Sequence, residues 1–125
     1  MIHLPRAVRI FAHREPVDMR KSYDTLGAVV RVAMGKDVMV GDVFVFVGRR
    51  RRTAKALWWD GTGMVLLAKR LAKGRFAAPW EVAGGDAVRW TTTELALFLE
   101  GSDLVGRRPL SPPPWDPTER RLEFD

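Results

Sequence analysis

Residues 43–80 read VFVFVGRRRRTAKALWWDGTGMVLLAKRLAKGRFAAPW, and this stretch decides the fold. Residues 43–47 are apolar without interruption, which predicts a strand buried on both faces. Residues 55–59 and 64–70 predict two more strands, and Asp60-Gly61-Thr62-Gly63 between them has the glycines of a tight hairpin turn. We therefore expect an antiparallel meander, because three strands with an apolar face can hold together in water.

The sequence before this stretch predicts a short strand and a helix. Residues 7–12 alternate apolar and polar side chains, as a strand with one buried face does. Pro16 and Asp18 then mark a helix start, with Asp18 at the N-cap, and apolar side chains recur at helical spacing up to Met34. Because Gly35 suits a C-cap, we expect an amphipathic helix over residues 18–34.

The sequence after it predicts one more strand and one more helix. Residues 87–90 follow a Gly-Gly break and have the composition of a strand. Thr91 or Thr92 with Glu94 resembles a helix N-cap, and a short apolar helix over residues 93–100 would stop at Gly101. The chain is thus expected to be an α+β protein, with a curved antiparallel sheet on which both helices pack.

Length and composition indicate a single domain. The chain has 125 residues, of which 46% are hydrophobic and 29% charged, as is usual for a globular protein. We place the domain at residues 1–106, because residues 107–125 are rich in proline and charge and predict an extended or disordered tail. No apolar run approaches the ~20 residues that cross a bilayer, so we expect a cytoplasmic protein without a membrane partner.

Few residues suggest catalysis. The chain has no cysteine, and its histidines, His3 and His13, lie among arginines near the N-terminus, where we expect structural or surface roles. No Walker-type or dinucleotide glycine pattern occurs, and we predict no cofactor and no metal. A nuclease would hold its metal with carboxylates, yet the aspartates fit simpler roles as caps, turn formers and loop residues. The candidates are Asp18, Asp24, Asp42, Asp60, Asp86 and Asp103. We predict that the chain is not an enzyme.

Positive charge is concentrated in the meander. Between residues 44 and 75 there are nine basic side chains and one acidic one, a local charge of +8, whereas the whole chain carries only +6. Arginine loops on a hairpin can follow a phosphate backbone or enter a groove of DNA. The predicted DNA-binding residues are Arg49, Arg50, Arg51, Arg52, Lys55, Lys69, Arg70, Lys73 and Arg75.

The arginines and tryptophans of this stretch could also have purely structural roles. The arginines could be a solubilising device at a sheet edge, and a GC-rich genome would also enrich arginine. Trp58 and Trp59 point to opposite sides of their strand, so at most one can stack on bases while the other joins the core. Both could instead be buried against sheet neighbours.

Three blocks of sequence resemble the Orf2-like accessory proteins of bacterial insertion sequences of the sixty-six family. The blocks are residues 16–26, residues 44–76 and residues 95–103, which together span about residues 8 to 104 in order and at natural spacing. The motif residues that carry the resemblance include Asp18, Met19, Arg20, Lys21, Trp58, Trp59, Asp60 and Gly61. One departure follows the first two arginines, where that family usually has a Gly-Asp type turn and this chain has Arg51-Arg52-Thr53.

The resemblance implies a small accessory protein, often labelled transposition protein B, which is encoded beside a separate transposase that carries the acidic catalytic residues. It implies a role in DNA transposition without a chemical activity of its own. The expected partners are DNA, either transposon ends or target, and the other proteins of the same element. The alternative is a protein interaction module that docks on the transposase and does not bind DNA itself.

Overall fold

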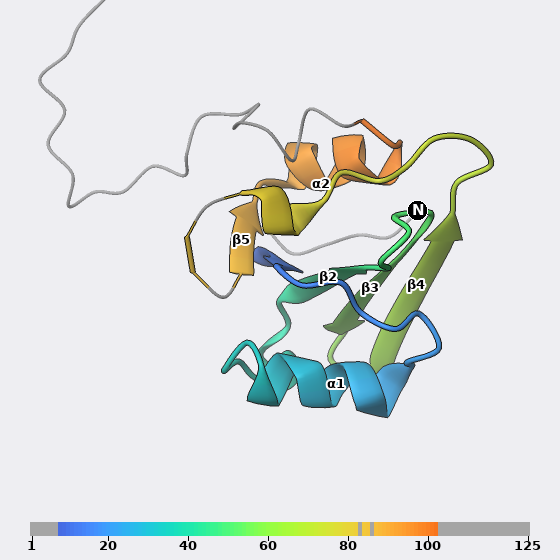
Figure 1. Ribbon diagram of the computed structural model, residues 1–125. Coiled ribbons are helices and arrows are strands. Elements are labelled where there is room, and N and C mark those ends of the chain that lie inside the picture. The colour runs from blue at the N-terminus through green and yellow to red at the C-terminus, as the bar shows by residue number, and fades with distance from the viewer. Residues whose placement is uncertain (1–7, 83, 86, 103–125) are drawn as a thin grey trace, which may run out of the picture.

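The computed structural model describes residues 8–102 except 83 and 86. Five strands form one open sheet in the order β4-β3-β2-β1-β5. Helix α1 covers one face of this sheet and helix α2 covers the other, so the molecule has three layers (Figure 1). The elements in chain order are β1 (Ile10–His13), α1 (Tyr23–Val32), the 3-10 helix η1 (Val38–Val40), β2 (Val43–Val47), β3 (Thr53–Trp59), β4 (Met64–Arg70), the 3-10 helix η2 (Pro79–Glu81), β5 (Ala87–Trp90) and α2 (Thr92–Leu99).

The predicted α+β class and the β2-β3-β4 meander are confirmed. The sheet is not wholly antiparallel, however, because β1 pairs with β2 in the parallel direction, with Ile10 opposite Val43. The chain passes through α1 between these two strands and so returns along the same direction. On its other side β1 pairs antiparallel with β5, with Ile10 opposite Trp90.

Side chains alternate between the two faces of the sheet and build two separate cores. The core beneath α1 is formed by Phe11, Phe44, Phe46, Leu57, Leu26 and Val30, among others. The core beneath α2 includes Val45, Trp58, Phe76, Trp90 and Phe98. All five residues of β2 are buried, as expected for a central strand that is covered on both faces.

The predicted start of the first helix is wrong. Helix α1 begins at Tyr23, after Ser22, whose backbone N–H donates to Thr25 Oγ1 at 2.8 Å. Asp18 instead forms a local turn: its carboxylate accepts from the backbone N–H of Arg20, and its carbonyl accepts from Lys21 N. The turn keeps residues 18–21 out of the helix, because Asp side chains readily stabilise such non-helical backbone.

The C-terminal elements agree closely with expectation. Strand β5 spans the predicted residues, and Thr91 caps α2 by accepting from Glu94 N, while the Glu94 carboxylate accepts from Thr91 N. Helix α2 ends before Gly101, which has the left-handed φ of 88°. The predicted tail at residues 107–125 lies outside the described residues, as do His3, Asp86 and Asp103.

Candidate nucleic-acid interface

Residues 48–52, which we name the arginine loop, join β2 to β3 in a tight hairpin. Gly48 N donates to Thr53 O at 3.0 Å, and Arg51 N donates back to Gly48 O at 2.9 Å. The turn ends on Arg51 in the left-handed conformation, with φ of 61°. A hairpin turn of this kind normally places glycine there, because a side chain in this region costs about 1–2 kcal/mol. Arg51 is the only described residue other than glycine with such a φ.

Arg51 and its neighbour also hold the basic turn, residues 71–76, against the arginine loop. The Arg51 side chain donates from Nε to Phe76 O at 2.7 Å, and Phe76 N donates to Arg51 O at 2.6 Å. Leu71 N donates to Arg52 O at 2.9 Å. Both ends of the basic turn are therefore fastened to the arginine loop, although the two segments lie about twenty residues apart in the sequence.

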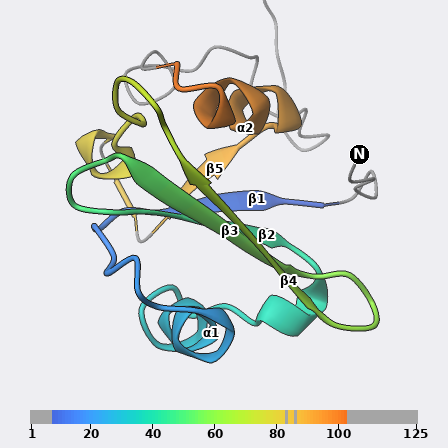
Figure 2. The same ribbon diagram turned by 90° about the vertical axis from the view of Figure 1, so that its right-hand side faces the viewer.

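A third segment, residues 16–21, runs along the same end of the sheet, and we name it the strap. Val17 N donates to Val47 O at 3.0 Å, so the strap is hydrogen-bonded to the last residue of β2. A Cβ added to Gly48 would lie 2.8 Å from Met19 Cγ, so glycine leaves the room that Met19 occupies. Lys55 Nζ donates to Lys21 O at 2.7 Å. Figure 2 shows the strap and the arginine loop together, at the opposite end of the hairpin from the β3–β4 turn.

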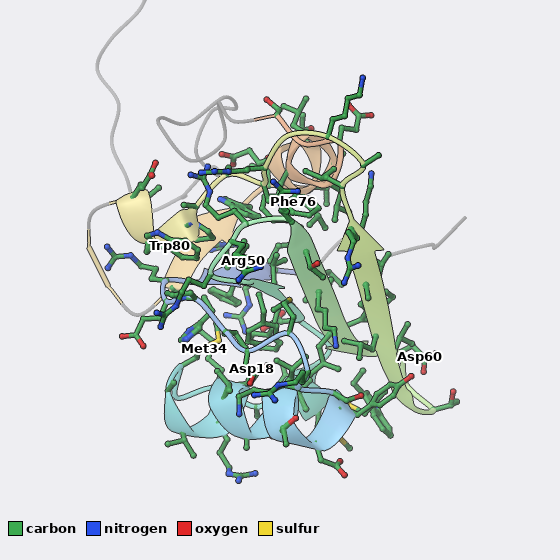
Figure 3. The ribbon with its side chains drawn as sticks, turned by 45° about the vertical axis from the view of Figure 1, so that its right-hand side comes forward. Asp18, Met34, Arg50, Asp60, Phe76 and Trp80 are labelled. Atoms are coloured by element: carbon green, nitrogen blue, oxygen red, sulfur yellow. The ribbon has the colours of Figure 1, made fainter. Side chains whose placement is uncertain are left out.

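The strap, the arginine loop and the start of the basic turn line a half-open cleft of about 510 Å³. Its apolar lining comes from Val17, Met19 and Leu71, and its charged lining from Asp18, Arg49, Arg50, Arg51, Arg52 and Arg70, with Gly48 and Thr53 between them. Asp18 and Arg50 both line the cleft, and Figure 3 shows Asp60 well to one side of both, at the β3–β4 turn. Five arginines and one aspartate line the cleft, so the net charge of its lining is positive.

The carboxylate of Asp18 is already engaged by Arg20. Arg20 donates from Nε to Oδ1 at 3.0 Å and from Nη2 to Oδ2 at 2.6 Å, and its backbone N–H donates to Oδ1 as well. The Arg20 guanidinium, followed by this backbone N–H, holds the pKa of Asp18 far below its usual range. Asp18 thus stays ionised near neutral pH, and its charge is balanced by Arg20 rather than by the cleft arginines.

The nine predicted DNA-binding residues fall into two groups in the structure. Seven of the nine are exposed, and Lys69 is one of them. The other six exposed residues form the first group and lie on the arginine loop, at the last residue of β4 or on the basic turn: Arg49, Arg50, Arg52, Arg70, Lys73 and Arg75. The other three donate to backbone carbonyls. Arg51 is held by Phe76 O, Lys55 reaches Lys21 O on the α1 face, and Lys69 reaches Leu99 O at 2.6 Å, at the end of α2.

The motif residues Trp58, Trp59, Asp60 and Gly61 occupy the strand and the hairpin turn that the sequence predicts for them. Trp58 is buried beneath α2 and Trp59, on the other face, is half-buried. Asp60 closes the β3–β4 turn by accepting from Thr62 N at 2.9 Å and Gly63 N at 3.0 Å, while Gly61 takes the left-handed φ of 105°. These hydrogen bonds lower the pKa of Asp60. The turn is therefore stabilised by its own hydrogen bonds, and it lies away from the cleft.

Asp42 and His13 take structural positions. Asp42 is buried and forms an ion pair with Arg9, from Nη2 to Oδ2 at 2.8 Å. His13 is buried beside Phe46, and burial lowers its pKa, although Glu15 acts in the opposite direction. Within residues 8–102, leaving out 83 and 86, no three His, Asp or Glu side chains are grouped as metal ligands would be. Nor does any helix of this part of the chain have the length and hydropathy to span a membrane.

Comparison with known proteins identifies the family. Residues 8–109 match the model of the family described as IS66 Orf2 like protein. The chain belongs to the IS66 Orf2-like family. As a member of it, the protein is an accessory protein of IS66 transposition, and this family is not a known catalytic one. The predicted resemblance is therefore confirmed.

Two relatives of this IS66 Orf2-like protein come from Sinorhizobium fredii strain NGR234. The uncharacterized protein y4jC is 36% identical over 115 residues, which cover 90% of this chain and 97% of y4jC. The uncharacterized protein y4hO is 34% identical over 96 residues, which cover 77% of this chain and 82% of y4hO. No solved structure matches the chain significantly.

The cleft of this IS66 Orf2-like protein was not predicted from its sequence. The strap and the arginine loop are separate motifs there, and their contact depends on Val17 pairing with Val47 across about thirty intervening residues. One signal was present in the sequence: Gly48 directly precedes four arginines, and a glycine beside a strand often marks the close approach of another segment. That segment is the strap, through Met19.

Proposed function

We propose that the protein is a non-catalytic accessory factor that binds DNA during transposition, using the arginine loop, the end of β4 and the basic turn on phosphates. The observation that carries this proposal is the gathering of six exposed cations on segments that are hydrogen-bonded to one another. Arginine suits phosphate because its planar fork can donate two parallel hydrogen bonds to one anion. Nine predicted contact residues were named from the sequence, and the structure favours these six for direct contact.

The distribution of the cations over two joined loops supports binding along a backbone rather than at one point. The cations come from two loops whose ends are joined by the hydrogen bonds from Leu71 N to Arg52 O and from Phe76 N to Arg51 O. The arginine loop is thus hydrogen-bonded to the basic turn and packed against the strap, and these contacts fix the conformation of the hairpin. A fixed loop loses less conformational entropy on binding than a mobile one.

The test is the salt dependence of DNA affinity. In the variant that combines Arg49→Ala, Arg50→Ala and Arg52→Ala, we expect weaker binding to a short duplex and a shallower slope of log affinity against log salt. Each lost phosphate contact should reduce the slope by about 0.9. Arg51 is left in place because its side chain holds Phe76. Fluorescence anisotropy at several salt concentrations measures both quantities.

Arg31→Ala serves as the matched control, since Arg31 is an exposed cation in the last turn of α1, away from the arginine loop. It should leave both the affinity and the slope unchanged. A triple variant that binds duplex DNA as tightly as the parent, with the same slope, would sink the proposal.

The alternative is a protein interaction module that docks on the separate transposase. It is favoured by large apolar side chains that are exposed on α1 and η1: Val32 is 77% exposed and Val40 is 65% exposed. Under this alternative, co-purification with the transposase survives the triple arginine variant and fails in Val32→Asp with Val40→Asp. Under DNA binding alone, the aspartate pair leaves DNA affinity almost unchanged.

A further inference from the structure

We propose that the cleft between the strap and the arginine loop takes one unpaired nucleotide of a DNA strand, with its base against the apolar wall and its phosphate on the arginines. This inference rests on the proposed DNA binding and adds the form of DNA that the site prefers. Its starting point is the shape of the site: phosphate contact alone would need only cations on a flat or convex surface, whereas here arginines and apolar side chains together line a half-open cleft.

The size of the cleft excludes a duplex and suits a single nucleotide. Its volume of about 510 Å³ falls within the range of roughly 300–1,000 Å³ that encloses a small organic ligand. The major groove of DNA alone is about 12 Å wide, so a double helix can only lie across the mouth of the cleft. A base that has left its stack can enter.

The lining has the two chemistries that a nucleotide needs. Met19 and Leu71 are partly exposed and supply apolar surface, whereas Val17 is buried in the core beneath α1. The thioether of Met19 is a polarisable group that packs well against aromatic rings. Arg49, Arg50 and Arg70 supply cations that bind phosphate and whose guanidinium planes can also stack on a base. Proteins that bind single strands combine a positively charged groove with aromatic side chains on which bases stack. In this cleft Met19, Leu71 and the guanidinium planes would take the place of the aromatic side chains.

The carboxylate of Asp18 does not oppose this use. Two side-chain nitrogens and the backbone nitrogen of Arg20 occupy it, so its charge is already compensated at the cleft edge. The apolar wall is also fixed in place, because Val17 is hydrogen-bonded to Val47 and Met19 rests on Gly48. A preformed site of this kind favours DNA in which the base is already unpaired, since extruding a base from an intact duplex costs a few kcal/mol.

The experiment compares three duplexes of equal length in the parent protein: one fully paired, one with a single bulged adenine and one with an abasic site at the bulge. The adenine and abasic probes carry the same number of phosphates, so any difference between them reports contact with the base. We expect the adenine bulge to bind roughly tenfold more tightly than the abasic bulge. With 2-aminopurine at the bulge, fluorescence should change on binding. Equal affinities for the adenine and abasic bulges would overturn the inference.

Uncharged variants test the apolar wall separately from the phosphate contacts. In Gly48→Ala the new Cβ would lie 2.8 Å from Met19 Cγ, so the Met19 side chain must move, and Met19→Ala removes it. Both should reduce the ratio of adenine-bulge affinity to abasic-bulge affinity severalfold, and this ratio is the readout because it cancels any change in phosphate contact common to the two probes. Gly27→Ala is the matched control, because nothing lies within 4 Å of a Cβ added there. Retention of the full preference in both wall variants, with folding verified by circular dichroism, contradicts the inference.

The outcomes separate this inference from the proposed function. If the parent binds all three duplexes equally and the triple arginine variant loses that binding, the phosphate surface stands and the nucleotide site falls. If no probe binds at low salt, both fall together.

Discussion

The two loops at opposite ends of β3 are built in different ways. The β3–β4 turn is held by its own residues, since Asp60 accepts from Thr62 and Gly63 and glycine occupies the left-handed position. The arginine loop has an arginine at its left-handed position and depends on the strap and the basic turn for support. A loop whose hydrogen bonds are made by its own residues needs no other segment to reverse the chain. Backbone strain held in place by other segments often marks a functional position. We therefore connect the strain of the arginine loop with the display of its exposed arginines.

Phe76→Ala should have the largest effect, because it removes the anchor of the basic turn. Phe76 is fully buried and stacks on Phe98 with ring centroids 4.9 Å apart. We expect the free energy of unfolding to fall by about 3–5 kcal/mol, as measured by urea denaturation. The comparison variant is Met64→Ala, next to the Asp60 turn, where Met64 is only partly buried and the loss should be smaller. Equal losses would show that the two ends of β3 are supported alike.

Arg51→Ala should have an intermediate effect. Alanine keeps the strained φ and loses the hydrogen bond to Phe76 O, so we expect a loss of about 1 kcal/mol in unfolding free energy. The DNA affinity at fixed salt should fall as well, because the basic turn is no longer fastened by this side chain. An unchanged stability in Arg51→Ala would contradict the supporting role of Arg51.

Arg51→Gly should have a smaller effect than Arg51→Ala. Glycine relieves the strain at φ of 61° while it loses the same hydrogen bond, so the two changes offset to within about 1 kcal/mol. At the other end of β3, Gly61→Ala introduces strain at φ of 105° with nothing gained, and it should be destabilising. Thermal denaturation of the three variants compares the left-handed positions of the two loops directly. If Arg51→Gly lowers the melting temperature as much as Gly61→Ala does, backbone strain at Arg51 contributes little to stability.

Asp60→Asn should give the smallest effect, which appears in the pH dependence of stability. The pKa of Asp60 is lowered in the folded protein, so its contribution to stability is present above the unfolded pKa of about 3.9 and is lost as pH falls through the folded value. The stability difference between parent and variant should therefore shrink below about pH 4, as followed by thermal melts. DNA affinity at neutral pH should be unchanged, because the turn lies at the far end of the hairpin from the cleft.

Local patterns predicted the elements, whereas contacts distant in sequence decided the site. The meander, β5 and the cap of α2 followed from alternation, glycine turns and the Thr91–Glu94 pair. The start of α1 was missed because a helix-capping aspartate and a turn-forming aspartate look alike until Arg20 is seen to bind it. The parallel pairing of β1 with β2 and the cleft beside the strap both join segments about thirty residues apart, which no local periodicity encodes.

The position of β1 between β2 and β5 has a consequence for how the chain reaches its final form. Strands β2, β3 and β4 pair with neighbours in sequence and can assemble early, whereas β1 must wait for residues 43–45 and then for residues 87–90. Long-range pairing of this kind slows folding, because loop closure must precede the gain from the contacts. On the ribosome, the apolar residues 10–12 leave the exit tunnel long before their last partner does. During that interval they lack their partner strands and can mispair with another molecule.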